Sequence, residues 1–261
     1  MLPSAVALAK VEASHNYFFM KTKVTAALLI IGDEILSGRT QDQNLNFLAK
    51  GLGEIGINLC EVRVVADIEL EIIEALNFLR KKFDYVFTSG GIGPTHDDIT
   101  SESIAKAFGD KLIKNTEAMA ILISHYGAEN VNEARAKMAF IPSQASLLAN
   151  PISSAPGFRI ENVFVMAGIP KIFQAMFAAA KTELNGGNKI SSREIKISLT
   201  ESIIAQDFSD LQKKYAFVTM GSYPFEGGTS LVFRSTDIKF LNCAFDEMLK
   251  KIDQNSIIKI S

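Results

Sequence analysis

The sequence lacks several features that mark broad classes of protein. It contains no tryptophan, three histidines and two cysteines in 261 residues. Cys60 and Cys243 form no CxxC pair and no Cys/His cluster, which argues against a zinc site. This sparing use of cysteine favours a reducing, cytoplasmic setting.

An excess of basic charge and a long apolar run are missing as well. The formal net charge is -2 and the isoelectric point is near 6.0, so no global field favours nucleic acid or an anionic membrane. The longest apolar run near the start, residues 26–31, is far shorter than the roughly 20 residues of a membrane helix. We therefore expect no nucleic-acid partner and no membrane partner.

The sequence does have the composition and periodicity of a folded α/β protein. Hydrophobic residues make up 48% of the chain and charged residues 21%, which is ordinary for a globular protein. Apolar runs of strand length alternate with apolar residues at helical spacing, which predicts a doubly wound sheet that binds ligands at the carboxyl ends of its strands. We expect strands at residues 24–31, 57–65, 85–87, 157–160 and 163–166, helices at 41–56, 69–82, 100–108, 115–126, 132–139 and from 170, and a loop over 142–156.

The chain is expected to have four segments. Residues 1–19 are predicted to be an N-terminal extension, because Met20-Lys21-Thr22-Lys23 before the first strand resembles a natural start. Residues 20–184 form the sheet domain, and residues 185–189, with two adjacent glycines, form a linker. Residues 190–261 are predicted to be a small α+β domain, with strands at 194–199, 216–220 and 230–234 and helices at 203–215 and 239–252.

A glycine-rich segment follows the strand at residues 85–87, and we call residues 90–98 the glycine loop. Gly90, Gly91 and Gly93 permit positive φ and carry no Cβ, so backbone N–H groups can converge there on a phosphate. We assign Ser89 and Thr95 to the same phosphate-binding set. The alternative is an ordinary serine–glycine turn that binds nothing.

Two adjacent carboxylates, Asp97 and Asp98, lie at the end of the glycine loop. They are hard oxygen ligands and suit a divalent metal such as Mg²⁺, Mn²⁺ or Co²⁺ that bridges to phosphate oxygens. The alternative is that Asp98 is a plain helix N-cap, which would still leave Asp97 for the metal. Thr100 or Ser101 is also predicted to cap the helix that runs to Phe108.

Other polar groups are expected at the same edge of the sheet. Glu34 follows the first strand and Asp67 follows the second, while Asn44 lies near the start of the first helix. Because the carboxyl ends of parallel strands share one edge, we expect Glu34 and Asp67 to lie beside the loop carboxylates, where either could position a water molecule. The alternative is that Asp67 caps the next helix and Glu34 is a solvated loop residue.

A second segment, residues 150–158, is rich in proline and small residues. Prolines fix its path, while Ser153, Ser154 and Gly157 permit close approach and hydrogen bonding. We predict that this segment, with Pro156, forms a wall against a nucleotide or pterin ring. It could equally be a rigid crossover without a ligand.

These motifs resemble the molybdopterin-binding-domain superfamily that includes MogA, MoaB and the gephyrin G domain, and within it the N-terminal half of CinA. The matching segments are residues 32–38, Asn44, residues 88–100, residues 150–158 and residues 168–170. The resemblance covers residues 23–181 well and the terminal domain more loosely. It implies a three-layer fold, with a mixed, mostly parallel sheet flanked by helices, followed by a small α+β C-terminal domain.

The resemblance implies two competing activities. CinA-type domains and the related domain of eukaryotic FAD synthase are metal-dependent pyrophosphatases acting on ADP-ribose or FAD, whereas MogA-type proteins adenylate molybdopterin. Asp67 and Asp98 fall at the family's functional aspartates, and residues 89–93 fall where it binds phosphate. We expect a pyrophosphatase with a nucleotide or pterin phosphate ligand, in a homo-oligomer, and keep as the alternative a molybdopterin-binding adenylyltransferase or non-catalytic carrier.

The chain departs from the CinA pattern at three places. His96 replaces a common lysine, which removes a fixed positive charge beside the phosphates. Met166-Ala167-Gly168-Ile169-Pro170 replaces a Leu-Pro-Gly-x-Pro motif. The sequence also ends without the deamidase domain of CinA, so we expect that activity to be absent.

Overall fold

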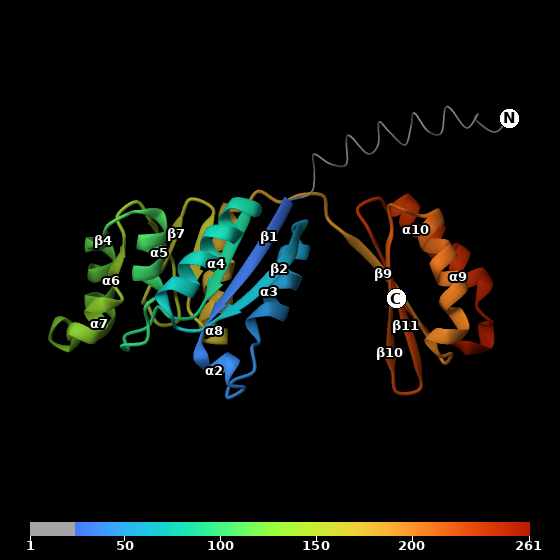
Figure 1. The fold of residues 1–261 in the computed structure, drawn as a ribbon, viewed down its shortest axis with the longest axis horizontal. Helices are drawn as coiled ribbons and strands as arrows, with labels where there is room; N and C mark the ends of the chain where they lie inside the picture. Colours follow the sequence, from blue (N-terminus) through green and yellow to red (C-terminus); the bar gives the residue numbers. More distant parts are fainter. Residues whose placement is uncertain (1–23) are drawn as a thin grey trace, which may run out of the picture. The chain divides into compact units, whose positions relative to one another are not determined.

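The described part of the chain divides into two compact units (Figure 1). The structure is a computed structural model that describes residues 24–261. The N-terminal unit ends at Gly187, and the C-terminal unit comprises Asn188–Ser261. The predicted extension over residues 1–19 and the predicted start at residue 20 lie outside the described residues.

A six-stranded sheet forms the centre of the N-terminal unit, with the strand order β2-β1-β3-β8-β7-β6. The pairs β1–β2, β1–β3 and β3–β8 are parallel, whereas β7 is antiparallel to both β8 and β6. The prediction of a mixed, mostly parallel sheet is therefore confirmed. The strands are β1 (Val24–Ile31), β2 (Ile57–Val65), β3 (Tyr85–Ser89), β6 (Ser146–Leu148), β7 (Gly157–Ile160) and β8 (Val163–Met166).

Helices cover both faces of this sheet, and the side chains of β1 pack against helices on each face. Ala27, Leu29 and Ile31 pack in one apolar cluster with α4 (Glu69–Lys82) and α5 (Thr100–Phe108). The alternate residues of β1 pack in a second cluster with α3 (Asn44–Gly53) and α8 (Pro170–Ala180). Because successive side chains of a strand point to opposite faces, a strand covered on both faces must be apolar throughout.

Smaller elements lie between α5 and β7. They are β4 (Leu112–Lys114), α6 (Thr116–Tyr126), α7 (Glu133–Lys137) and β5 (Phe140–Pro142). Asn115 and Asn132 cap α6 and α7 by accepting hydrogen bonds from backbone N–H groups. The prediction of an unbroken loop over 142–156 is wrong, because β6 pairs there with β7; three residues are too few to show a strand period.

The C-terminal unit has a four-stranded antiparallel sheet, ordered β10-β11-β9-β12. Two helices pack against the sheet through a core that includes Phe208, Phe233 and Phe245. The elements are β9 (Ser191–Ile197), α9 (Glu201–Lys214), β10 (Thr219–Phe225), β11 (Gly228–Ser235), α10 (Ile238–Lys251) and β12 (Ile257–Ile260). The strand predicted at 216–220 thus begins later and runs further, and β12 was not predicted.

The glycine-rich linker begins as part of the N-terminal unit. The N–H of Gly187 donates to the carbonyl of Ile55 at 3.1 Å, so this end of the linker has a partner. Within residues 24–261, none of the helices combines the length and apolar character needed to cross a membrane.

We expect Leu28→Ala to lower the free energy of unfolding by about 2–5 kcal/mol, because it removes a fully buried side chain of the central strand and leaves a cavity. Leu70→Ala is the matched control, since Leu70 is 63% exposed, and it should change stability by less than about 0.5 kcal/mol. Urea denaturation measures both. Similar losses in the two variants would contradict the assignment of β1 to the core.

Candidate active site

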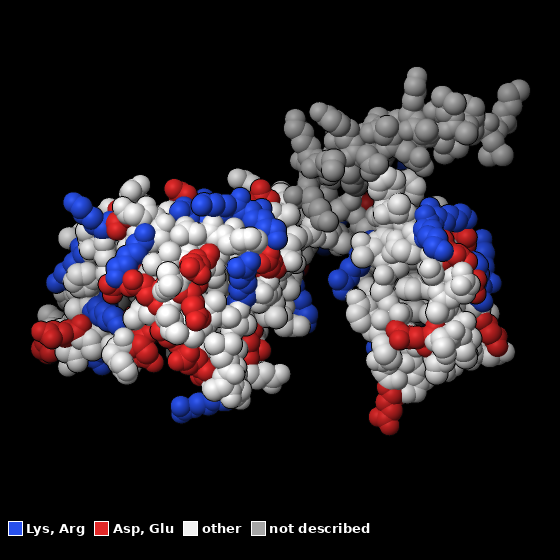
Figure 2. All heavy atoms as spheres, in the orientation of Figure 1, with Lys and Arg blue, Asp and Glu red and all other residues white. Residues whose placement is uncertain are grey.

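Three chain segments meet at the carboxyl ends of β1, β2 and β3. The short helix α2 (Asp33–Leu36) follows β1, Asp67 follows β2, and the glycine loop follows β3. The N–H of Asp33 donates to the Asp67 carboxylate at 3.0 Å, which joins the first two segments directly. Figure 2 shows acidic side chains along the lower margin of the N-terminal unit, where β1 ends in Figure 1.

Glycine is required at the start of the glycine loop. Gly90 and Gly91 have φ of 112° and 69°, which L side chains rarely adopt. A Cβ on Gly90 would lie 2.1 Å from the carbonyl oxygen of Ile31, and one on Gly91 would lie 2.1 Å from Thr100 Oγ1. The loop is therefore folded tightly against β1 and against the start of α5.

Thr100 fixes this loop and does not cap the helix as predicted. It is the first residue of α5, its N–H donates to the Gly91 carbonyl at 3.0 Å, and its hydroxyl donates to the Gly90 carbonyl at 3.1 Å. The N-cap position is Ile99, which makes no side-chain cap bond. The threonine side chain is thus used to close the glycine turn.

The two loop aspartates have different surroundings. Asp98 Oδ2 accepts hydrogen bonds from the Thr95 N–H at 2.8 Å and from the Thr95 hydroxyl at 2.5 Å. It therefore braces the turn and is not the N-cap of α5. Asp97 is exposed, and the nearby Thr95 hydroxyl, its own N–H and the charges of His96 and Lys137 hold its pKa below the usual value.

Four carboxylates interact across the three segments, and we call Asp33, Glu34, Asp67 and Asp97 the acidic cluster. Burial raises the pKa of Asp67 above its usual value, and the charges of the other three raise it further. The hydrogen bond from the Asp33 N–H opposes this shift. Asp67 interacts with Glu34 and with one of the two loop carboxylates, Asp97. Asp67 does not cap α4, whose N-cap is Ile68.

Asn44 presents an unsatisfied acceptor next to the cluster. Its side chain is 2% exposed, and its amide nitrogen donates to Ser89 Oγ at 2.8 Å and to the Gly168 carbonyl at 2.7 Å. Its Oδ1 is buried without a hydrogen-bond partner among the described residues. Asn44 and Glu34 both line a small cavity of about 50 Å³, and a buried unpaired acceptor there favours a ligand or a water molecule with a donor group.

The donor set fits a divalent cation only if the ligand helps to bind it. Within residues 24–261, no group of three or more His, Cys, Asp or Glu side chains is arranged to hold a metal ion. Mg²⁺ is commonly bound by one or two carboxylates, with water and substrate phosphates completing its shell. Crowded carboxylates beside the glycine loop could supply the protein ligands for a cation bound in this way.

A larger cavity of about 240 Å³ is lined in part by the glycine loop. We call it the loop cavity; it is bounded by Gly93, Pro94, Tyr126, Arg135, Ser153 and Ala155. The predicted wall thus meets the glycine loop here through Ser153. Pro156 and Gly157 are buried instead, and a Cβ on Gly157 would lie 2.3 Å from the Val165 carbonyl oxygen. Ser154 contacts His125 Nδ1 at 3.1 Å.

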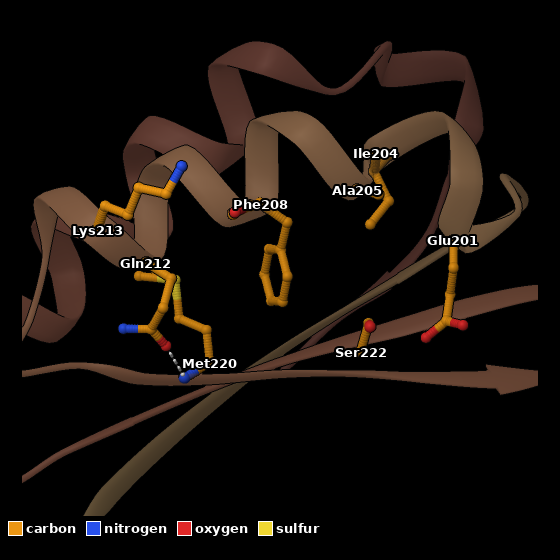
Figure 3. A pocket seen from close by; sticks show the side chains of 9 residues that line it. Glu201, Ile204, Ala205, Phe208, Gln212, Lys213, Met220 and Ser222 are labelled. Atoms are coloured by element: carbon orange, nitrogen blue, oxygen red, sulfur yellow. Dashed lines mark hydrogen bonds between the residues drawn. The ribbon is translucent and has the colours of Figure 1, made fainter.

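A third cavity, of about 430 Å³, lies in the C-terminal unit between α9 and β10 (Figure 3). Phe208, Ile204 and Met220 give it apolar walls. Gln212 accepts a hydrogen bond from the Met220 N–H at 2.9 Å and donates to the Val218 carbonyl, so its amide serves to hold the edge strand. None of the residues predicted to form the active site lines this cavity.

The sequence did not identify the residues that α6 and α7 place beside the glycine loop. Lys137 Nζ donates to the Thr95 carbonyl, which places a positive charge beside the loop although His96 replaces the usual lysine. The His96 side chain itself is fully exposed. No sequence motif marks Lys137 or Arg135, because both reach the loop only through the docking of α7.

The family model described as "Probable molybdopterin binding domain" matches residues 27–185, which is more than half of the chain. The chain belongs to this family. The model described as "FAD synthase, middle domain" matches residues 189–261. The resemblance seen in the sequence motifs is confirmed, and the C-terminal unit has a family of its own.

Relatives of this molybdopterin-binding-domain protein carry several names. A "Probable FAD synthase" of Caenorhabditis elegans is 32% identical over 231 residues, 78% of this chain and 44% of that protein. A "CinA-like protein" of Flavobacterium psychrophilum is 36% identical, over 56% of this chain and 36% of that protein. The solved structure of CinA from Thermoplasma acidophilum is 33% identical, covers 62% of this chain and 98% of that one, and gives a TM-score of 0.59. The chain spans less than half the length of these two curated relatives.

Asp67→Asn should stabilise the protein at neutral pH. A raised pKa means that the folded chain holds this proton more tightly than the unfolded chain, so the wild type loses stability as pH rises from the usual carboxyl range through the raised pKa. The asparagine is never ionised and still accepts the Asp33 N–H bond. Because solvent screens the partly exposed cluster, we expect a gain in Tm of about 1–2 °C at neutral pH.

The control is the same pair of proteins melted at acidic pH, where Asp67 is protonated in both states and the gain should vanish. Glu74→Gln, an exposed change on α4, should show no such pH dependence. A lower Tm of Asp67→Asn at neutral pH would contradict the repulsion within the acidic cluster.

Proposed function

We propose that the N-terminal unit hydrolyses the pyrophosphate bond of a dinucleotide such as ADP-ribose or FAD, with a divalent metal (Mg²⁺, Mn²⁺ or Co²⁺). The observation that carries this proposal is the acidic cluster beside the glycine loop, where burial and then the charges of the other three carboxylates raise the pKa of Asp67. A carboxylate with a raised pKa is a better general base than an ordinary one. Repelling carboxylates are also stabilised when a cation binds among them.

In the proposed reaction, water attacks one phosphorus and the bond to the bridging oxygen breaks. Asp67 accepts the proton of the attacking water, and Glu34 orients that water from the end of β1. Backbone N–H groups of Gly90, Gly91 and Gly93, with Ser89 and Thr95, hold the phosphate oxygens. The buried Asn44 Oδ1, which has no partner among the described residues, accepts a hydrogen bond from the ligand or from the water.

The proposed metal ligands are Asp97 and Asp98. Asp98 would use the oxygen that does not accept from Thr95. The cation would neutralise the pyrophosphate oxygens, where charge develops. AMP is one product, and ribose phosphate or FMN is the other.

The comparisons support a flavin-type or nucleotide ligand. A relative aligned over 78% of this chain is named "Probable FAD synthase", and the C-terminal unit matches the middle domain of FAD synthase. Because the chain spans 44% of that relative, synthesis of FAD is not part of the proposal.

A second candidate function is binding or adenylation of molybdopterin. It is favoured by the match of residues 27–185 to a probable molybdopterin-binding domain. Metal-independent binding of a pterin phosphate without turnover would support a carrier, and transfer of AMP from ATP to the pterin would support an adenylyltransferase.

Incubation with FAD or ADP-ribose and a divalent metal should release AMP, measured by chromatography. Asp67→Asn should lower kcat by about 10²-fold or more, because it removes the general base. Glu74→Gln, an exposed acid on α4, is the matched control and should keep wild-type activity. Wild-type AMP release no greater than that of Asp67→Asn would exclude the hydrolase.

A further inference from the structure

The loop cavity contains a cation without an anionic partner. Arg135 is half-buried and lines this cavity, and it forms no ion pair with any residue in the range 24–261. The cavity wall contains no carboxylate. A half-buried cation at a cavity wall without carboxylates is suited to a ligand that supplies acceptor atoms.

The guanidinium group of Arg135 is held in a fixed plane. Its Cζ lies 4.3 Å from the centre of the Tyr126 ring, and Nη1 donates to the Asn130 carbonyl at 2.6 Å. The His125 ring supports Tyr126 in an edge-to-face contact at 4.6 Å. Because arginine has five N–H donors in a planar fork, most of them have no partner among the described residues and can serve a ligand.

The rest of the loop cavity is suited to a flat apolar ring. Ile92, Ile169 and Ile172 line it together with Pro94 and Ala155. Its volume of about 240 Å³ is below the roughly 300–1,000 Å³ of pockets that enclose whole drug-sized ligands. A cavity of this size has room for one ring of a larger ligand but not for the whole of it.

We propose that the loop cavity binds a planar nitrogen heterocycle that carries a carbonyl oxygen next to a ring nitrogen, and that Arg135 donates to this pair. An arginine fork makes two parallel hydrogen bonds to such a pair, as it does to the O6 and N7 atoms of guanine. Flavins, pterins and oxo-purines share the pair. Adenine does not, because an amino group that is itself a donor replaces the carbonyl.

This inference rests on the proposed function, and it selects among the substrates named there. FAD presents a flavin ring with the required pair of acceptors, whereas ADP-ribose offers only adenine. Arg135 is thus a specificity-determining residue of the same site.

The first test compares two ligands on the unmodified protein by isothermal titration calorimetry. IMP and AMP differ chiefly at one ring position, where IMP has a carbonyl oxygen and AMP an amino group. We expect IMP to bind about tenfold more tightly than AMP, and FMN to bind at least as tightly as IMP. Equal affinity for IMP and AMP would overturn the inference, whatever any variant does.

The second test asks whether Arg135 causes the preference. Arg135→Met should reduce the affinity ratio of IMP to AMP to about one, and Arg135→Lys, which keeps the charge but loses the fork, should restore little of it. Arg80→Met is the matched control, because Arg80 also stacks on a ring, Phe108 at 4.0 Å, and donates to a backbone carbonyl, Ala107, but lines none of the described cavities. An unchanged ratio in folded Arg135→Met would also overturn the inference.

The proposal of hydrolysis and the proposal of a ring-binding site can be disproved separately. FMN contains no pyrophosphate, so its binding does not depend on turnover. Arg135-dependent binding of FMN without AMP release from FAD would remove the proposed hydrolysis and leave the ring site. AMP release from FAD and ADP-ribose with equal kcat/KM, with no preference for IMP, would remove the ring site and leave the hydrolysis.

Discussion

Parallel pairing of β1 with both β2 and β3 is the constraint on which the candidate site depends. The register aligns Ile31 with Val65 and Ile30 with Ser89, so three segments that are remote in sequence leave the sheet at one level. The Gly32 N–H continues the ladder to the Val65 carbonyl at 3.2 Å. The acidic cluster and the glycine turn are neighbours because these strands end together, and the apolar packing on both faces of β1 keeps them there.

This arrangement concentrates negative charge at one edge of the sheet, and the fold must tolerate the repulsion. Burial, together with the charges of Asp33, Glu34 and Asp97, raises the pKa of Asp67 and so disfavours its ionised form in the folded chain. Like charges held close together reduce the free energy of unfolding. Such unfavourable arrangements are common at functional sites, where selection acts on function as well as on stability. Hydrogen bonds to Asp67 and Asp98 from neighbouring N–H groups hold the carboxylates in place despite the repulsion.

The sequence predicted the parts of this molecule that depend on local patterns. β1, α4 and the glycine turn each have a continuous signature within a few residues, and Glu34 and Asp67 follow from the rule that parallel strands share an edge. The strands β6 and β12 are too short for a period to be visible. The partners of Asp98 and Thr100, and the approach of Arg135 and Lys137, depend on how separate segments dock, which no local spacing encodes. Pro156 and Gly157 were assigned to the ligand wall, but both are buried, and Gly157 is the first residue of β7.

The helix α7 has five residues, and its two basic side chains reach different parts of the site. Arg135 lines the loop cavity, while Lys137 holds the Thr95 carbonyl, and Thr95 in turn binds Asp98. Arg135 and Lys137 are separated by one residue, so both side chains depend on how this one short helix is docked. In the proposed site, the contact to the ring would therefore be linked through one short helix to the turn assigned to the phosphate. With this linkage, free energy from binding the ring would help to position the phosphates for reaction. A preference for one ring over another would then change kcat as well as Kd.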